Sequence, residues 1–105
     1  MIARIWHGWT TPRNADAYES LLAREIFPGI QERAISGYRG IQLLRRNLGE
    51  EVEFATVMWF DSLEAVRGFA GADHEAAVVP AAARALLSRF EARSQHYEVR
   101  TDLKA

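Results

Sequence analysis

Three histidines, His7, His74 and His96, are the side chains of this sequence best suited to proton transfer near neutral pH. An ordinary imidazole has a pKa of about 6.5, so its neutral form can take a proton from a phenol. His74 lies in the irregular stretch GADHEAA, and His96 lies at the start of a late strand pattern. We take these two as candidate catalytic bases, and an exposed, non-catalytic histidine is the alternative at each position.

The spacing of the histidines does not favour a metal site. They lie on three separate segments, without the H-x-H or H-x-x-x-H spacing that brings two rings to one ion. The chain has no cysteine, which excludes thiolate ligands, cysteine nucleophiles and disulfides. It also has no glycine-rich phosphate loop. We expect neither a metal nor another cofactor.

Aromatic side chains are the candidate walls of a binding site. The stretch RIWHGWT holds Trp6, His7 and Trp9, and Trp59 and Phe69 follow later in the chain. Flat rings can stack on a flat ligand, although most large aromatic residues simply fill a core. Strand alternation puts Trp6 on one face and His7 with Trp9 on the other. We expect one of these faces to line a pocket and the other to pack elsewhere.

The elements that must position these residues follow from the apolar pattern. Strands are predicted over 1–10, 38–47, 52–60 and 95–101, with a short polar turn over 48–51. A helix capped by Thr11 or Asn14 is expected to end or kink at Pro28. This order of elements, completed by the helical segments described next, predicts an α+β, ferredoxin-like split βαβ fold with a four-stranded antiparallel sheet.

Two further helical segments are predicted between the third and last strands. Asp61 or Ser62 caps the first of them, and Asp61 with Glu64 has the spacing of a capping box. Pro80 is placed to begin the second, whose apolar stripe consists of Ala83, Leu86, Leu87 and Phe90.

Length and composition suggest one domain with a second buried surface. The 105 residues fit a single domain, which we place at 1–101 with a polar tail at 102–105. Hydrophobic residues make up 49% of the chain, which is more than a core of this size readily holds. The strand at 52–60 is apolar on both faces, so we expect a homodimer that covers the face without helices.

The charge balance excludes several classes of partner. Thirteen basic and fourteen acidic residues give a formal net charge of −1, whereas a nucleic-acid or acidic-membrane partner favours a basic face. No apolar run approaches the roughly 20 residues that span a bilayer, and no secretory leader is visible. We expect a cytoplasmic protein without nucleic-acid or membrane partners.

Much of the chain resembles a known family. The matching stretches are ARIWHGWT, GIQLLRRNLGEEVEFATVMWF, DSLEAVRGFAGADHEAAVVP and QHYEV, which together cover about 2–99. They resemble the antibiotic-biosynthesis-monooxygenase-like family of the dimeric α/β barrel superfamily. The resemblance implies a homodimer whose two sheets form a barrel, with a pocket between sheet and helices in each subunit. It also implies oxygenation of polycyclic aromatic substrates without metal or flavin.

The sequence departs from this family in two places. Close members carry an acidic pair after the proline that begins the late helix, where this chain has Ala81, Ala82 and Ala83. Haem-degrading relatives use a Trp and a His around the second helix, and those positions correspond to Phe69 and about Val79 here. Haem degradation is therefore not expected.

The leading hypothesis is a cofactor-independent monooxygenase that acts on a small or polycyclic aromatic substrate in a sheet–helix pocket. His74 and His96 are its candidate bases, and the candidate substrate-binding residues are Trp6, His7, Trp9, Trp59 and Phe69. The alternative is a non-catalytic dimer that binds a small ligand or serves a structural role. A haem or metal binder is a third hypothesis, which is disfavoured because the Trp and His of haem-degrading relatives are missing here. A concave pocket of roughly several hundred cubic ångströms with an inward His74 or His96 would favour the enzyme, whereas a closed space with no lining histidine would favour the non-catalytic dimer.

Overall fold

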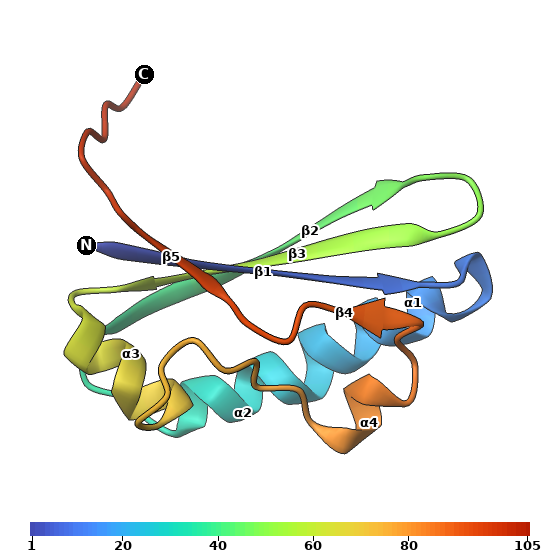
Figure 1. Ribbon diagram of the computed structural model, residues 1–105, viewed down its shortest axis with the longest axis horizontal. Coiled ribbons are helices and arrows are strands. Elements are labelled where there is room, and N and C mark those ends of the chain that lie inside the picture. The colour runs from blue at the N-terminus through green and yellow to red at the C-terminus, as the bar shows by residue number, and fades with distance from the viewer.

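The computed structural model describes all 105 residues as one antiparallel sheet with every helix on the same face (Figure 1). The sheet order is β2–β3–β1, and β4 and β5 both pair with the remaining edge of β1. The strands are β1 (Ile2–Thr10), β2 (Tyr38–Asn47), β3 (Val52–Phe60), β4 (Arg89–Phe90) and β5 (Gln95–Glu98). The predicted ferredoxin-like fold is confirmed, with five strands instead of four, because two short strands share the last position.

The first helical layer begins as the sequence predicts. The helix α1 (Pro12–Leu21) is capped by Thr11, whose Oγ1 accepts a hydrogen bond from the backbone N–H of Asn14 at 3.2 Å. Of the two predicted caps, Thr11 is therefore the one used. The cap satisfies a backbone donor that the first helical turn leaves unpaired.

The helix neither ends nor is interrupted at Pro28. A π-helical segment, η1 (Leu22–Ile26), leads directly into α2 (Phe27–Glu32). Pro28 has no N–H to donate, and the wider turn before it has Phe27 bonding five residues back, to the carbonyl of Leu22. The shift in hydrogen-bond register accommodates the proline without breaking the helix.

The helix after β3, α3 (Leu63–Ala70), has a simpler cap than predicted. Ser62 Oγ accepts from the N–H of Ala65 at 3.2 Å, whereas the expected capping box of Asp61 and Glu64 is absent. Asp61 instead accepts two hydrogen bonds from the guanidinium of Arg39 on β2. This ion pair takes the carboxylate away from the helix N-terminus.

The prediction was wrong for most of the late helix. The helix α4 (Ala81–Arg84) has only four residues, and Phe90 of its expected stripe lies in β4. Backbone N–H groups of Ser88 and Glu91 donate to the carbonyls of Trp9 and His7, at 2.7 and 3.0 Å. Pairing with the open edge of β1 therefore replaces helical hydrogen bonds in this segment. The last strand also ends earlier than predicted, at Glu98.

The apolar core between sheet and helices is divided into two clusters. The cluster under α1 contains Ala15, Tyr18, Leu22, Val52, Phe54 and Ala83. The cluster under α3 contains Met58, Phe60, Ala65, Val66 and Phe69. Members of both clusters line the pocket described below, which therefore lies where the two parts of the core meet.

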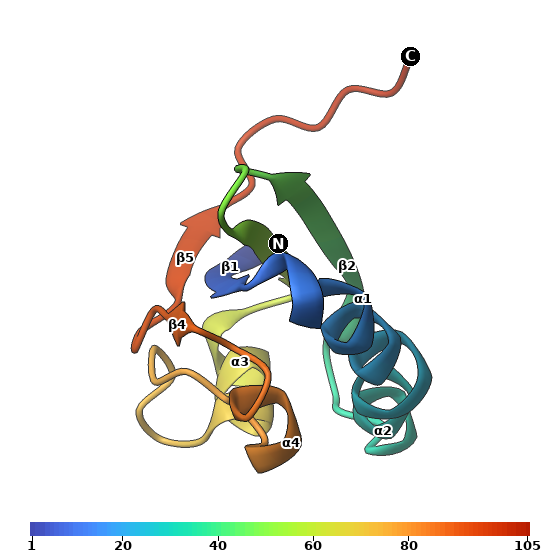
Figure 2. The same ribbon diagram turned by 90° about the vertical axis from the view of Figure 1, so that its right-hand side faces the viewer.

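The other face of the sheet has no helix over it (Figure 2). It carries apolar side chains on several strands, of which Leu44 and Tyr97 are 51% and 57% exposed. Residues 99–105 form no helix or strand and extend away from the sheet (Figure 1). None of the helices has the length and apolar character required to cross a bilayer.

Candidate functional site

A largely apolar pocket lies between the sheet and the helices, with a cavity volume of about 60 Å³. Tyr18 and Leu22 reach it from the first helical layer, Phe69 from α3, and Trp6 and Met58 from the sheet. The sheet residues come from the face that alternation directs toward the helices. The pocket is well below the roughly 300 Å³ or more of typical small-molecule sites.

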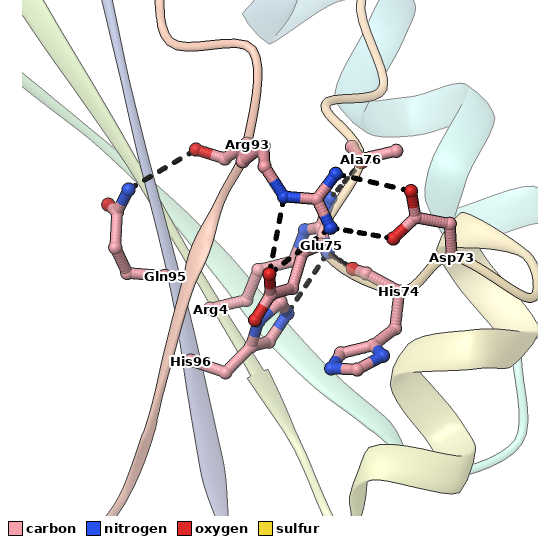
Figure 3. Close-up of polar contacts among 8 residues, drawn as sticks. All are labelled: Arg4, Asp73, His74, Glu75, Ala76, Arg93, Gln95 and His96. Carbon is pink, nitrogen blue, oxygen red and sulfur yellow. Dashed lines mark hydrogen bonds and ion pairs between the residues drawn. The ribbon is translucent and has the colours of Figure 1, made fainter.

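A buried cation, Arg4, lies at one end of this pocket. Its side chain is 3% exposed, and no carboxylate forms an ion pair with it. Its Nη1 donates to the carbonyl of His74, and its Nη2 donates to the carbonyl of Ala76 at 2.9 Å (Figure 3). Burial lowers the pKa of Arg4 to about 10. The guanidinium therefore stays charged at neutral pH and ties the 73–76 segment to β1.

Ser94 is the second buried polar group that lines the pocket. The residue is 4% exposed, and its hydroxyl has no hydrogen-bond partner. Its backbone is fixed, because its N–H donates to the carbonyl of Glu75 at 2.7 Å. A buried hydroxyl without a partner is uncommon, since the missing hydrogen bond costs free energy. Arg4 and Ser94, with Thr56, are thus the polar residues of a largely apolar lining.

His96 lies beside Arg4 and is a weak base in this position. The two residues pair across β5 and β1, and Arg4 Nη1 lies 3.0 Å from His96 Nε2. A guanidinium only donates, so Nε2 accepts, and the other ring nitrogen, Nδ1, is buried without a partner. Burial, the charge of Arg4 and His74 together lower the pKa of His96 to about 4. The ring is neutral at pH 7, with its basic nitrogen already occupied.

His74 lies in the loop between α3 and α4, next to His96. The two ring centroids are 5.2 Å apart, and Glu75 brings a carboxylate to the same place (Figure 3). Ligand atoms of His74, Glu75 and His96 all lie within 4.8 Å of one another, a grouping that sequence spacing did not predict. Arg4 contacts His96 and Arg93 pairs with Glu75 at 3.2 Å. These two guanidinium groups already engage His96 Nε2 and a carboxylate oxygen of Glu75, and their positive charges oppose a cation there, so the set fits a metal ion poorly.

Neither candidate base lines the pocket, although both lie just behind its polar end. Both contact Arg4, which does line it: Arg4 donates to the His74 carbonyl and contacts His96. The catalytic role assigned to His74 and His96 from the sequence stays a prediction.

Two of the five expected wall residues, Trp6 and Phe69, line the pocket. The indole Nε1 of Trp6 donates to the carbonyl of Glu91 at 2.7 Å, which fixes the ring against the final part of the chain. The Phe69 ring centroid lies 5.4 Å from Arg4 Cζ, within the range of a cation–π contact. Aromatic rings therefore adjoin the polar end of the pocket.

The other three expected wall residues, His7, Trp9 and Trp59, lie on the open face of the sheet. Trp59 pairs with Ala3 across β3 and β1, so it lies on the face opposite Trp6. His7 contacts a Glu91 carboxylate oxygen at 2.8 Å, and Arg89 lies 3.9 Å over the ring of Trp9. The face of β1 that lines the pocket is therefore the one with Trp6, and His7, Trp9 and Trp59 are corrected as candidate wall residues, because the β1–β3 register is unbroken and no bulge occurs at Gly8.

The polar residues of the pocket were missed in the sequence. Arg4 had a readable signal, because alternation places it on the same face as Trp6, and a charged residue on a helix-covered face is unusual. Ser94 had none, since it lies outside the predicted strand and its burial depends on how the last two strands meet β1.

Fold and pocket together define the class of this protein: a ferredoxin-like α+β domain with an apolar pocket between an antiparallel sheet and its helices. No protein-family model matches the chain, and no curated protein sequence matches it. Solved structures with the same fold align with almost the whole length of the chain.

Three of these structures illustrate the likeness. A Bacillus cereus protein proposed to be an antibiotic biosynthesis monooxygenase has a TM-score of 0.71 at 13% identity, over 99% of this chain and 97% of that one. SnoaB, a cofactor-independent oxygenase from Streptomyces nogalater, has a TM-score of 0.61 at 21% identity, over 99% and 98%. The heme-degrader MhuD from Mycobacterium tuberculosis, solved with two hemes bound in its active site, has a TM-score of 0.58 at 24% identity, over 99% and 100%.

The chain therefore has the ferredoxin-like fold of antibiotic-biosynthesis-monooxygenase-like proteins, as the sequence resemblance predicted. At these identities the likeness establishes a shared fold. Activity and ligand must be argued from the residues of this pocket.

Proposed function

We propose that this protein binds a small aromatic molecule in its sheet–helix pocket and oxygenates it without a metal or flavin. The observation that carries the proposal is an apolar pocket with aromatic walls, Trp6 and Phe69, and a buried cation at one end, Arg4. The description of SnoaB as a cofactor-independent oxygenase of the same fold supports the reaction type.

Such a reaction requires a substrate that supplies the electrons itself. A hydroxylated aromatic can lose a proton and then pass electrons to O₂. Oxidation of a phenol at a ring C–H to the quinone by one O₂ is balanced, because one oxygen atom becomes the new carbonyl and the other leaves as water with the ring hydrogen and the phenolic hydrogen. The protein contributes a water-poor pocket and a positive charge for the developing oxyanion.

The size of the pocket favours a small substrate over a polycyclic one. Its volume of about 60 Å³ is below the roughly 150 Å³ of a cavity that binds benzene, so even a single ring requires some opening of the pocket and a fused system requires much more. A polycyclic substrate requires Val78, Val79 and Pro80, which line the pocket from the loop before α4, to move outward.

A non-catalytic ligand-binding protein is the second candidate, and it has its own supporting observation. No histidine lines the pocket, and His96 combines a pKa of about 4 with an occupied Nε2. A general base works best with a pKa near the working pH, so His96 is poorly suited to take a proton at pH 7.

We also infer that two copies pair through their open sheet faces. Ile5, Trp9, Val57 and Trp59 share this face, are only partly buried within one chain and have no helix over them (Figure 2). An apolar face of this kind marks an interaction surface, and a second copy offers an identical, self-complementary one.

Oxygen uptake with a panel of hydroxylated aromatics, compared with ligand binding to the same compounds, separates the two candidates. Turnover that requires O₂ and proceeds without added metal or flavin supports the oxygenase. Binding without O₂ uptake across the panel supports the non-catalytic alternative. If no compound binds or reacts, the pocket is not a site for small aromatics and both candidates fail.

A further inference from the structure

We propose that Arg4 and Ser94 form an anion-binding end of the pocket, so that the ligand is an aromatic oxyanion, a phenolate or a carboxylate. This inference rests on the proposed function, because it takes the sheet–helix pocket as the ligand site. It adds the chemical class of the ligand and the two residues that select it.

The first support is the unpaired charge of Arg4. Six exposed arginines are paired with carboxylates: Arg39 with Asp61, Arg45 with Asp16 and Glu19, Arg46 with Glu53, Arg67 with Glu64, Arg89 with Glu51, and Arg93 with Asp73 and Glu75. Five others have no carboxylate partner but are exposed to water: Arg13, Arg24, Arg33, Arg84 and Arg100. Arg4 is far more buried than these and has no such partner. A buried cation without a counter-charge is costly, and an anion in the adjoining pocket removes that cost.

The second support is the number of donors left over. A guanidinium has five N–H groups, and Arg4 makes three polar contacts, with His74, Ala76 and His96. None of the three involves Nε, so its N–H and one further N–H have no protein acceptor. Two N–H groups of one guanidinium can bind a single oxyanion in the bidentate manner that makes arginine selective for such groups.

The third support is the orphan hydroxyl of Ser94. It is buried, lines the same pocket and lacks a partner within the protein. Thr10 provides an instructive contrast, because its hydroxyl is also buried and unpaired but it does not line the pocket. An oxyanion bound by Arg4 can accept a hydrogen bond from Ser94 as well.

The apolar part of the pocket indicates the rest of the ligand. Phe69 packs against Arg4, Met58 pairs with Arg4 across β3 and β1, and Trp6 lies two residues further along the same face. An aromatic ring can lie against these side chains while its oxyanion meets the guanidinium. A nearby positive charge also lowers the pKa of a bound phenol, so its anion forms without a strong base. The weakness of His96 as a base is then no obstacle to ionisation.

Matched pairs of small ligands test the inference on the unaltered protein. The pairs are 4-nitrophenol against 4-nitroanisole, and benzoate against benzamide, each titrated by calorimetry. We expect the anion-forming member of at least one pair to bind roughly 10-fold or more tightly than its neutral analogue, as charge-assisted hydrogen bonds imply. A preference within the nitrophenol pair indicates a phenolate ligand, and a preference within the benzoate pair indicates a carboxylate. With 4-nitrophenol, the yellow phenolate band should grow on binding at a pH below the pKa of the free phenol.

Variants assign the effect to the two residues. Ser94→Ala should weaken binding of the anion roughly 3- to 10-fold without loss of thermal stability, because the hydroxyl it removes is unpaired in the protein. Thr10→Val removes a buried, unpaired hydroxyl that does not line the pocket, and should leave binding unchanged. Arg4→Lys keeps the charge but loses the paired N–H donors of the guanidinium, and should reduce the preference for the anion.

The outcomes keep this inference separate from the proposed function. Equal binding of charged and neutral members, with Ser94→Ala and Thr10→Val indistinguishable, overturns the anion site but leaves a pocket for small aromatics. Failure of every compound to bind the unaltered protein overturns the pocket as a ligand site, and the inference with it.

Discussion

His96 gives the protein a pH dependence that originates in one side chain. Its pKa falls from an ordinary 6.5 to about 4 in the folded chain, because it is partly buried and faces Arg4 and His74, with Glu75 opposing the shift. Below pH 6.5 the unfolded chain takes up a proton on this ring before the folded chain does. Its contribution to the free energy of unfolding is therefore present above pH 6.5 and is lost as the pH falls to about 4.

Urea unfolding of the wild type and of His96→Gln, compared from pH 8 to pH 4, measures this contribution. We expect the difference in unfolding free energy between the two proteins to be constant above pH 7. The wild type should then lose stability relative to the variant between pH 6.5 and 4. Curves that stay parallel over the whole range would show that His96 keeps an ordinary pKa.

The tryptophans and His7 show what strand alternation can and cannot predict. It correctly separated Trp6 from His7 and Trp9, because the register between β1 and β3 has no bulge. It did not determine which face of β3 meets the helices, so Trp59 was assigned to the wrong side. Applying the same rule to Arg4 would have placed a charge beside Trp6.

Gly37 fixes the connection between α2 and β2. Its φ is +81°, and a Cβ on it would lie 2.6 Å from the Cβ of Ala65. We expect Gly37→Ala to destabilise the protein by about 1–3 kcal/mol, through backbone strain and this contact with α3. Thermal unfolding measures the change.

Gly29→Ala is the matched control for that substitution. Gly29 lies within α2, and a Cβ there would meet nothing within 4 Å. Alanine is the better helix former, so this change should stabilise the protein by about 0.5–1 kcal/mol. If both glycine variants shift stability in the same direction, the account of Gly37 is wrong.

Gly8 makes room in β1 for the indole that lines the pocket. A Cβ at this position would lie 2.7 Å from Cη2 of Trp6 and 3.0 Å from Cδ2 of Leu87. The ring cannot turn away freely, because its Nε1 donates to Glu91. We expect Gly8→Ala to cost about 1–3 kcal/mol of stability by overpacking, and to weaken binding of an aromatic ligand. Unchanged stability and unchanged affinity together would contradict this role of Gly8.

Elements were predictable where the local pattern decides them. Three long strands and the start of the first helix match the sequence because their apolar periodicity extends over many residues. The late segment does not match the prediction, because residues 88–91 form backbone hydrogen bonds with the open edge of β1, and no local pattern encodes that pairing. The pocket was equally hidden, since it lies where two core clusters from distant parts of the chain meet.

At the scale of the whole molecule, the open sheet face predicts association. The wild type should sediment with twice the mass of one chain. Val57→Arg places a charge in the middle of the proposed interface and should give the mass of one chain. Leu63→Arg, at the exposed start of α3 on the helical side, should leave the dimer intact. A wild type that sediments as a single chain would contradict the pairing.

The most direct test of the central claim, that the sheet–helix pocket binds a small aromatic, uses the three tryptophans as reporters. Trp6 lines the pocket, whereas Trp9 and Trp59 lie on the other face of the sheet. Their indole N–H signals can be followed by NMR during a titration with 4-nitrophenol, after assignment with single Trp→Phe variants. We expect the Trp6 signal to move and saturate while the other two stay in place. A Trp6 signal that does not move while either of the others does would contradict this expectation.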